Sequence, residues 1–303
     1  MRLHLHLSDL PFPADALSIA EAAESLGWEC VWVPERHLTP GSVPNPAVLL
    51  AAMAARTGTL RLGSEVAILP LRHPFQVAED YALLDALCAG RLEFGMGMGM
   101  VPAEFDALGL ERAEIFDRFD EASRIVQLAW AGTRFSHDGP IWPVTEATCV
   151  PAPARTPPLW VKGAARGSLT WAGSNGHNLI VDAARSSPEA FGKGLTAWVE
   201  GLARAGLKRT DRLVKLNLRV WVDEDGEAAL EAARAAGAKE DLLLSGRVLA
   251  GDPESCAIRL GDLLRAYPVD VISTCFDWLG QTTSAQLTAM RWFAAAISQV
   301  RHN

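Results

Sequence analysis

The sequence predicts an α/β fold, namely a (β/α)8 TIM barrel with an insertion between strands four and five. Short β-rich runs alternate with longer Ala-rich helical runs along the whole chain, and strictly alternating units imply a parallel sheet. Eight such strands are expected, the number that closes a TIM barrel. No linker or change of composition divides the 303 residues. We therefore expect a single domain over residues 1–303.

Each strand is expected where Val, Ile and Leu concentrate between turn residues. The predicted strands cover residues 3–7, 30–33, 60–69, 91–97, 159–162, 178–181, 214–222 and 269–274. The predicted helices, in which apolar residues recur at helical spacing, cover residues 14–26, 46–56, 75–88, 116–131, 168–174, 188–205, 227–236, 252–266 and 283–300. Asn45 and Pro46 suit the start of the second helix. Residues 132–158 are rich in proline, which suits an inserted loop or hairpin over the barrel mouth.

The composition excludes several classes of protein. With a net charge of −8, the chain lacks the basic surface that binding to nucleic acid requires. No apolar run approaches the roughly 20 residues that span a bilayer, and the first residues lack the apolar core of a secretion signal. The five cysteines form no CxxC pair, which argues against a disulfide framework or a zinc site. We therefore expect a cytoplasmic protein that binds neither nucleic acid nor membrane.

Polar residues at the C-terminal ends of the strands are the first candidates for a site, because TIM-barrel sites lie there. Glu35, Arg36 and His37 follow the second strand and form the densest such cluster. They could bind an anion or move protons, or they could form a local ion pair on a surface loop. After the fourth strand, Gly and Met alternate over residues 95–100. This pattern suits either the wall of a site for a planar ligand or a tight turn.

Small residues, an arginine and a hydroxyl follow the fifth strand. Gly163, Arg166, Gly167 and Ser168 stand where a helix is predicted to begin. They suit an anion site at a helix N-terminus, or an ordinary turn that Ser168 caps.

Two histidines share one face of the first strand. His4 and His6 have the spacing of two metal ligands in amidohydrolase barrels, and Lys162 and His177 could be imagined as further ligands. His177 precedes its strand, however, and so falls at the wrong end of the barrel. A place in the barrel interior or in the ligand cavity is therefore the better interpretation of the two imidazoles.

Lone carboxylates also lie near strand ends, at Asp9, Glu65, Asp182 and Asp277. Such a carboxylate is more often a cap or a solvated loop residue than a catalytic group. Glu65 differs because it interrupts an apolar strand, and a buried carboxylate needs a partner or a raised pKa.

The chain resembles the bacterial luciferase-like flavin monooxygenase family over nearly its whole length. An ordered set of segments carries the resemblance: residues 31–37 (VWVPERH), 60–63 (LRLG), 69–74 (LPLRHP), 78–80 (AED), 84–85 (LD), 90–95 (GRLEFG), 117–121 (DRF with Glu121) and 251–254 (GDPE). The set is specific to the family, although no single segment is. The resemblance implies a TIM barrel that binds reduced FMN, or a 5-deazaflavin (coenzyme F-420) in one large branch.

Several residues gain expected roles from this resemblance. It places Glu35, Arg36 and His37 in the active site, and we count His6 among the catalytic candidates. Glu65 and Val66 fall where the family often has a non-proline cis peptide bond against the flavin ring. The expected cofactor-binding residues are Glu65, Val66, Met98, Met100, Arg118, Gly163, Arg166, Gly167 and Ser168. Of these, Arg118, Arg166, Gly167 and Ser168 are expected to bind the phosphate.

Three departures from the family pattern bear on activity. The middle residue of the luciferase Glu-His-His is here Arg36, which stays protonated and is expected to bind an anion rather than transfer a proton. A phosphate-binding Arg of luciferase is replaced by Met98, which bears on the choice of flavin. The segment before Asp252 is too short for the long lid of luciferase, so we do not expect light emission from an aldehyde.

The sequence thus predicts a flavin-dependent monooxygenase that uses reduced FMN and O2 to oxygenate a small organic substrate. Because no G-x-G-x-x-G motif follows a strand, a separate flavin reductase would supply the reduced FMN. The alternatives are a deazaflavin-dependent hydride-transfer oxidoreductase, a non-catalytic flavin-binding relative and a metal-dependent amidohydrolase. The family commonly dimerises, so we expect a homodimer that uses the helices at 46–56 and 75–88.

Overall fold

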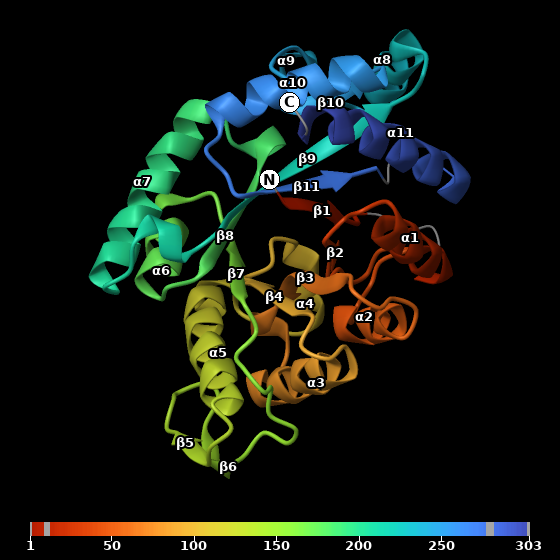
Figure 1. The fold of residues 1–303 in the computed structure, drawn as a ribbon. Helices are drawn as coiled ribbons and strands as arrows, with labels where there is room; N and C mark the ends of the chain where they lie inside the picture. Colours follow the sequence, from red (N-terminus) through yellow and green to blue (C-terminus); the bar gives the residue numbers. More distant parts are fainter. Residues whose placement is uncertain (1, 9–12, 277–281, 302–303) are drawn as a thin grey trace. The chain divides into compact units, whose positions relative to one another are not determined.

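The computed structural model describes residues 2–8, 13–276 and 282–301 (Figure 1). Within these residues the parallel sheet has the order β10-β9-β11-β1-β2-β3-β4-β7-β8, and β9 also pairs with β8. Its strands are β1 (Arg2–His6), β2 (Cys30–Val33), β3 (Arg61–Ile68), β4 (Leu92–Gly97), β7 (Leu159–Lys162), β8 (Asn178–Asp182), β9 (Val214–Val222), β10 (Val248–Gly251) and β11 (Val271–Cys275). Apart from β10, these strands alternate with helices as in a (β/α)8 TIM barrel. The predicted fold class is confirmed.

Apart from α4 and α9, the helices begin and end close to the predicted positions. They are α1 (Pro13–Ser25), α2 (Pro46–Ala54), α3 (Pro74–Leu87), α4 (Pro102–Ala107), α5 (Ile115–Trp130), α6 (Arg166–Ser174), α7 (Pro188–Arg204), α8 (Gly226–Ala235), α9 (Glu240–Leu244), α10 (Pro253–Ala266) and α11 (Thr283–Arg301). As predicted, Pro46 opens α2, and the side chain of Asn45 accepts the N–H of Ala47 at 3.1 Å. No helix in the described ranges is both long and apolar enough to cross a membrane.

Three elements were not predicted from the sequence, namely α4, α9 and β10. They have 6, 5 and 4 residues, too few to show a helical or strand period. β10 forms because it shares a small hydrophobic core with β9, α8 and α9. That core contains Trp221, Ala229, Ala233, Leu243, Val248 and Ala250.

The chain forms two compact units, Met1–Trp32 with Val161–Asn303, and Val33–Trp160. In the first unit, glycines let α6 and α7 approach closely. A Cβ atom at Gly173 would collide with the carbonyl of Trp198, and one at Gly201 with the carbonyl of Thr170. This packing positions the N-terminus of α6. The single domain expected over residues 1–303 stays a prediction.

In the second unit, the predicted insertion is an antiparallel hairpin of β5 (Phe135–His137) and β6 (Val144–Ala147). Glu121 of α5 holds the turn of this hairpin in place, because its carboxylate accepts the N–H groups of Trp142 at 2.7 Å and Ile141 at 3.3 Å. A Cβ atom at Gly139 would collide with the same carboxylate. The insertion is therefore an ordered part of this unit.

Candidate functional site

In the unit Val33–Trp160, Glu35 connects the residues after β2 with the end of β3. Its side chain is only 2% exposed. Carboxylate oxygen Oε1 lies 3.0 Å from Nε2 of His37, and Oε2 accepts the N–H of Ile68 at 3.0 Å. Both oxygens of this buried carboxylate are thus engaged, as a buried charge requires. The structure brings two of the three clustered residues, Glu35 and His37, into direct contact.

His37 is held from both sides. Its backbone N–H donates to Oε1 of Glu104 at 2.8 Å, and its side chain is 23% exposed. The hydrogen bond to the Glu35 carboxylate raises the pKa of His37 above its usual value, and this effect outweighs the opposing effect of burial. A partly exposed imidazole that titrates above its usual range can donate and accept a proton near neutral pH.

Glu104 was not predicted as a site residue. It lies in the six-residue helix α4, is almost fully buried and reaches the backbone of His37. No sequence pattern marks so short a helix, and only its position after the glycine–methionine run could have drawn attention to it.

Arg36 is the third residue of this cluster. The residue is exposed, and its backbone N–H donates to the carbonyl of Val43 at 3.0 Å. Its expected role in binding an anion stays a prediction.

The peptide bond between Glu65 and Val66 is cis, as the family resemblance implies. Glu65 is buried in β3, and the register between β3 and β4 shifts at this point, between Ser64 and Ala67. A Cβ atom at Gly97 would lie 2.6 Å from Cγ2 of Val66. The glycine thus makes room for Val66 at the end of β4.

The glycines and methionines after β4 have separate roles. Gly99, at a φ of 78°, leaves room for Ile68 and Phe105, which a Cβ atom would approach to 2.8 and 2.9 Å. At this position the glycine serves a tight turn, the simpler of the two interpretations. Met98 is half-buried and Met100 is exposed. Their contact with a flavin stays a prediction.

In the other unit, the residues of the predicted anion site lie at the N-terminus of α6. The helix begins at Arg166, two residues before the predicted start, and its N-cap residue Ala165 provides no capping side chain. Ser168 therefore does not cap the helix, and its hydroxyl donates to the carbonyl of Ala165 at 2.8 Å. The uncapped N–H groups of the first turn attract an anion.

The neighbours of this turn fit a phosphate group. Arg166 is 81% exposed, and its guanidinium lies 3.7 Å from Glu200. A Cβ atom at Gly167 would meet nothing within 4 Å, whereas one at Gly163 would lie 2.9 Å from Oγ of Ser168. An exposed arginine beside N–H groups that no side chain caps suits the phosphate of a flavin nucleotide.

Arg118 lies between an acidic and an aromatic neighbour. It belongs to the unit Val33–Trp160, where its Nε lies 3.3 Å from Glu114 and its guanidinium lies 5.1 Å from the ring centre of Trp142. Its expected place at the phosphate stays a prediction.

The two histidines of β1 take up separate contacts. Nδ1 of His4 accepts the indole N–H of Trp32 at 3.0 Å, and Nδ1 of His6 lies 3.4 Å from Oγ of Ser273. His4 is buried, and this supports the interpretation that it lines the barrel interior. Because its Nδ1 already accepts a hydrogen bond, that nitrogen is not a free metal ligand.

The other imagined metal ligands do not join them. Lys162 is exposed. His177 is buried beside Trp171, and burial lowers its pKa to about 4. Among the residues that the structure describes, no three His, Cys, Asp or Glu side chains form a group that could hold a metal ion. Asp182 accepts the N–H of Ala184, the ordinary role of a cap.

Two of the lone carboxylates considered from the sequence, Asp9 and Asp277, lie outside the described residues. Their expected roles stay predictions.

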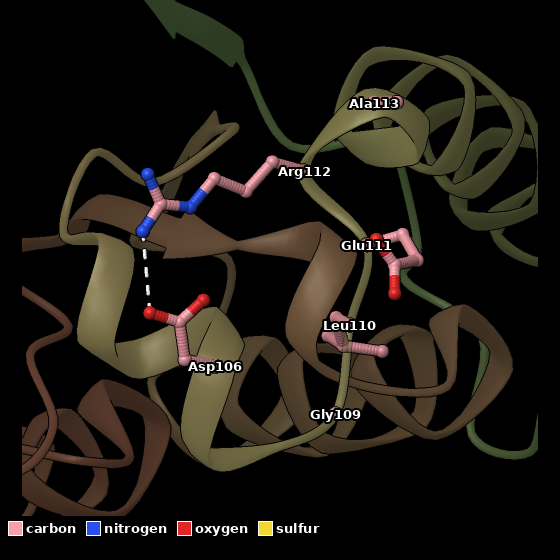
Figure 2. A pocket seen from close by; sticks show the side chains of 6 residues that line it. All are labelled: Asp106, Gly109, Leu110, Glu111, Arg112 and Ala113. Carbon is pink, nitrogen blue, oxygen red and sulfur yellow. Dashed lines mark hydrogen bonds and ion pairs between the residues drawn. The ribbon is translucent and has the colours of Figure 1, made fainter.

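A surface pocket lies elsewhere in the second unit (Figure 2). It is lined by Asp106, Gly109, Leu110, Glu111, Arg112 and Ala113. Arg112 reaches across it and donates to Asp106 at 3.2 Å. Its lining comes from one short segment and contains no residue of the Glu35–His37 pair, so the pocket is not our candidate site.

Comparisons with known sequences agree with these features. The family model of luciferase-like monooxygenases matches residues 4–242. Uncharacterized protein y4wF of Sinorhizobium fredii is 35% identical over 169 residues, which cover 55% of this chain and 49% of that protein. The F-420-dependent glucose-6-phosphate dehydrogenase of Beutenbergia cavernae is 33% identical over 235 residues, which cover 75% of this chain and 69% of that protein.

A third relative is a monooxygenase. The oxygenase component of the flavin-dependent trigonelline monooxygenase of Acinetobacter baylyi is 27% identical over 172 residues, which cover 55% of this chain and 48% of that protein. The chain thus spans about half the length of two of these relatives.

Solved structures share the fold. Monooxygenase RslO1 from Streptomyces bottropensis superposes with a TM-score of 0.91 at 24% identity and covers 99% of this chain and 100% of its own. The oxygenating constituent of 3,6-diketocamphane monooxygenase from Pseudomonas putida, in complex with FMN, gives a TM-score of 0.83 at 17% identity, with 99% and 98% covered. At these identities the likeness shows the TIM-barrel fold.

Proposed function

Because the chain belongs to the luciferase-like monooxygenase family, we propose that it is a flavin-dependent monooxygenase that uses reduced FMN and O2 to oxygenate a small organic substrate. The observation that carries the proposal is the buried Glu35 carboxylate with the partly exposed His37 imidazole, placed after β2 where TIM-barrel chemistry lies. A relative that is named as a flavin-dependent monooxygenase supports it.

Reduced FMN, when bound, would supply the electrons that activate O2. Arg166, Gly167 and the first N–H groups of α6 would hold its phosphate.

His37 would exchange a proton with the substrate or the cofactor through the exposed part of its ring. Glu35 would keep the imidazole oriented and raise its pKa, because the protonated ring donates to the carboxylate. The N–H of Ile68 donates to the other carboxylate oxygen, so Glu35 would hold the imidazole from a fixed position.

A second candidate is a coenzyme F-420-dependent oxidoreductase. It is favoured by the relative named as an F-420-dependent dehydrogenase, which is more identical to this chain than the trigonelline monooxygenase is. The same acid–base pair would serve either reaction, so the cofactor distinguishes the two.

The test is an anaerobic titration of the purified protein with reduced FMN and with reduced coenzyme F-420, followed by mixing with O2. Binding of FMN, together with O2 uptake that differs from that of free reduced FMN, is the expected result. Tight binding of coenzyme F-420 without O2 uptake would favour the second candidate. A protein that binds neither cofactor would contradict both.

We also propose that a separate reductase supplies the reduced FMN. The proposal further includes a homodimer that forms through α2 and α3, and a cytoplasmic location. The reductase would be recognised by NADH- or NADPH-dependent reduction of FMN in its presence but not in the presence of this chain alone.

A further inference from the structure

Helix α4 carries a buried carboxylate that bonds to another segment of the chain and not to its own helix. Glu104 is the third residue after the N-cap Val101, the position from which a glutamate ordinarily reaches back to the N-cap N–H. Its Oε1 instead accepts the backbone N–H of His37 at 2.8 Å. Within the described residues, this carboxylate makes no other hydrogen bond. A buried charge is thus committed to one backbone group of the candidate site.

The backbone that Glu104 holds has an uncommon conformation. Leu38, the residue after His37, has a φ of 60°, in the left-handed region that leucine seldom adopts because its Cβ atom crowds the following carbonyl oxygen. Leu38 is also exposed, so burial of its side chain does not offset this strain. Such backbone persists only where neighbouring contacts fix it. Here Glu104 accepts the N–H of His37, and Oγ1 of Thr39 donates to the carbonyl of His37 at 3.3 Å.

Helix α4 is fixed in place through Phe105, the residue after the buried carboxylate. Phe105 is buried, and a Cβ atom at Gly99 would lie 2.9 Å from its ring and 2.8 Å from the side chain of Ile68. Ile68 also donates its N–H to Glu35, the partner of the His37 ring. The ring and the backbone N–H of His37 are therefore held from two elements, β3 and α4, that meet at Gly99.

The two carboxylates act on His37 in different ways. The hydrogen bond between the ring and Glu35 is the main cause of the raised pKa of His37. The negative charge of Glu104 adds to this effect, whereas burial and the positive charge of Arg72 oppose it. Glu104 bonds the backbone and not the ring. A shift of that backbone would move the imidazole away from Glu35, from which Nε2 lies at 3.0 Å.

We propose that Glu104 is a positioning residue for the acid–base pair. By holding the N–H of His37, it fixes the left-handed turn at Leu38 and thereby keeps the imidazole within hydrogen-bond distance of Glu35. Helix α4 is then a part of the site as well as a connection between β4 and α5. The consequence for turnover rests on the proposed function, because a misplaced imidazole lowers the rate only of a reaction that uses His37.

The test separates the reach of the side chain from its charge. Glu104→Asp keeps the charge but is shorter by one carbon, so its carboxylate no longer reaches the N–H of His37. Glu104→Gln keeps the reach and an oxygen acceptor but loses the charge. Asp106→Asn is the matched control, because Asp106 is an exposed residue of the same helix that pairs with Arg112. Circular dichroism verifies the fold of each variant.

Two NMR measurements on the flavin-free chain provide the readouts. The first is the rate of hydrogen exchange at the backbone N–H of His37, which reports the bond to Glu104. The second is the titration midpoint of the His37 ring, which reports its contact with Glu35. Neither uses flavin or O2, so failure of this proposal is distinguishable from failure of the proposed function, which the flavin titration tests.

In Glu104→Asp we expect the N–H of His37 to exchange about tenfold faster or more. The His37 midpoint should fall further in Glu104→Asp than in Glu104→Gln, because loss of the ring contact with Glu35 outweighs loss of the more distant charge. Glu104→Gln should keep the slow exchange, and Asp106→Asn should match the unmodified chain in both measurements. Unchanged exchange in Glu104→Asp, a midpoint that falls equally or further in Glu104→Gln, or the same changes in Asp106→Asn would overturn the proposal.

Discussion

Glu35 holds His37 through one carboxylate oxygen and the backbone of β3 through the other. The Oε1–Nε2 distance to His37 and the Oε2–N distance to Ile68 are both 3.0 Å. Because both bonds start from one rigid carboxylate, the imidazole takes its orientation from the end of a buried strand. The acid–base pair is thereby anchored in the core of its unit.

Replacing Glu35 with Gln should lower the pKa of His37 toward its usual value of 6.5. In the unmodified protein the raised pKa keeps the imidazole protonated above that value. The hydrogen bond between His37 and Glu35 therefore contributes fully to the stability of the fold below about pH 6.5. This contribution is lost as the pH rises through the raised pKa of His37. In Glu35→Gln the amide oxygen can still accept the N–H of Ile68, so the fold should persist.

The measurement is an NMR titration of the His37 ring together with the pH profile of turnover. The alkaline limb of the profile should move to lower pH in Glu35→Gln. The exposed carboxylate of Glu114 provides the control, since Glu114→Gln should leave both titrations unchanged. An identical His37 midpoint in Glu35→Gln would contradict the assignment.

Replacing Arg166 with Ala should weaken FMN affinity about tenfold and leave riboflavin affinity unchanged. FMN carries the phosphate that the uncapped turn of α6 would bind, whereas riboflavin lacks it. Fluorescence titration with the two flavins measures the difference, with Arg204→Ala as the control. A parallel loss for both flavins would place Arg166 away from the phosphate. Ser168→Ala should add to the effect on FMN.

Replacing Gly97 with Ala should disturb the position of Val66. The added methyl group would lie 2.6 Å from Cγ2 of Val66, and relieving that overlap costs about 1–3 kcal/mol. We expect a lower free energy of unfolding and weaker flavin binding. Gly192→Ala is the matched control, because a Cβ atom there meets nothing within 4 Å and the site lies in helix α7. That variant should be more stable by about 0.4–1 kcal/mol. Equal stability and flavin affinity in Gly97→Ala and the unmodified chain would show that Val66 tolerates the methyl group.

The buried imidazole of His177 should make the protein sensitive to acid. Burial lowers its pKa to about 4, below the usual 6.5. The unfolded chain therefore takes up the proton first, and stability falls as the pH decreases from about 6.5 to about 4, by roughly 3 kcal/mol in total. In His177→Leu this part of the pH dependence should disappear. Urea unfolding between pH 7 and pH 4 measures it, and equal slopes for the two proteins would count against the assignment.

Much of the fold can be read from local patterns. The eight barrel strands and their helices follow from periodicity and from caps such as Asn45, which act within a few residues. The elements α4, α9 and β10 could not be predicted in this way, because each is too short to repeat a helical or strand period often enough to be recognised. The start of α6 differed by two residues because Ala165 has no capping side chain to mark it.

Only part of the candidate site could be predicted from the sequence. Glu35 and His37 were recognisable because two ionisable residues follow one predicted strand. Glu104 was not, since its contact with His37 joins residues 67 positions apart.

The sequence by itself determined the order of strands and helices, the barrel class and the strand ends at which ionisable residues stand, because these depend on neighbours in the chain. The tertiary structure alone decided that Glu35 bonds both His37 and Ile68, that His4 accepts from Trp32 and that Lys215 lies buried on the same indole. These contacts join residues far apart in sequence. Their energy depends on burial and on distances of a few ångströms, which no local pattern encodes.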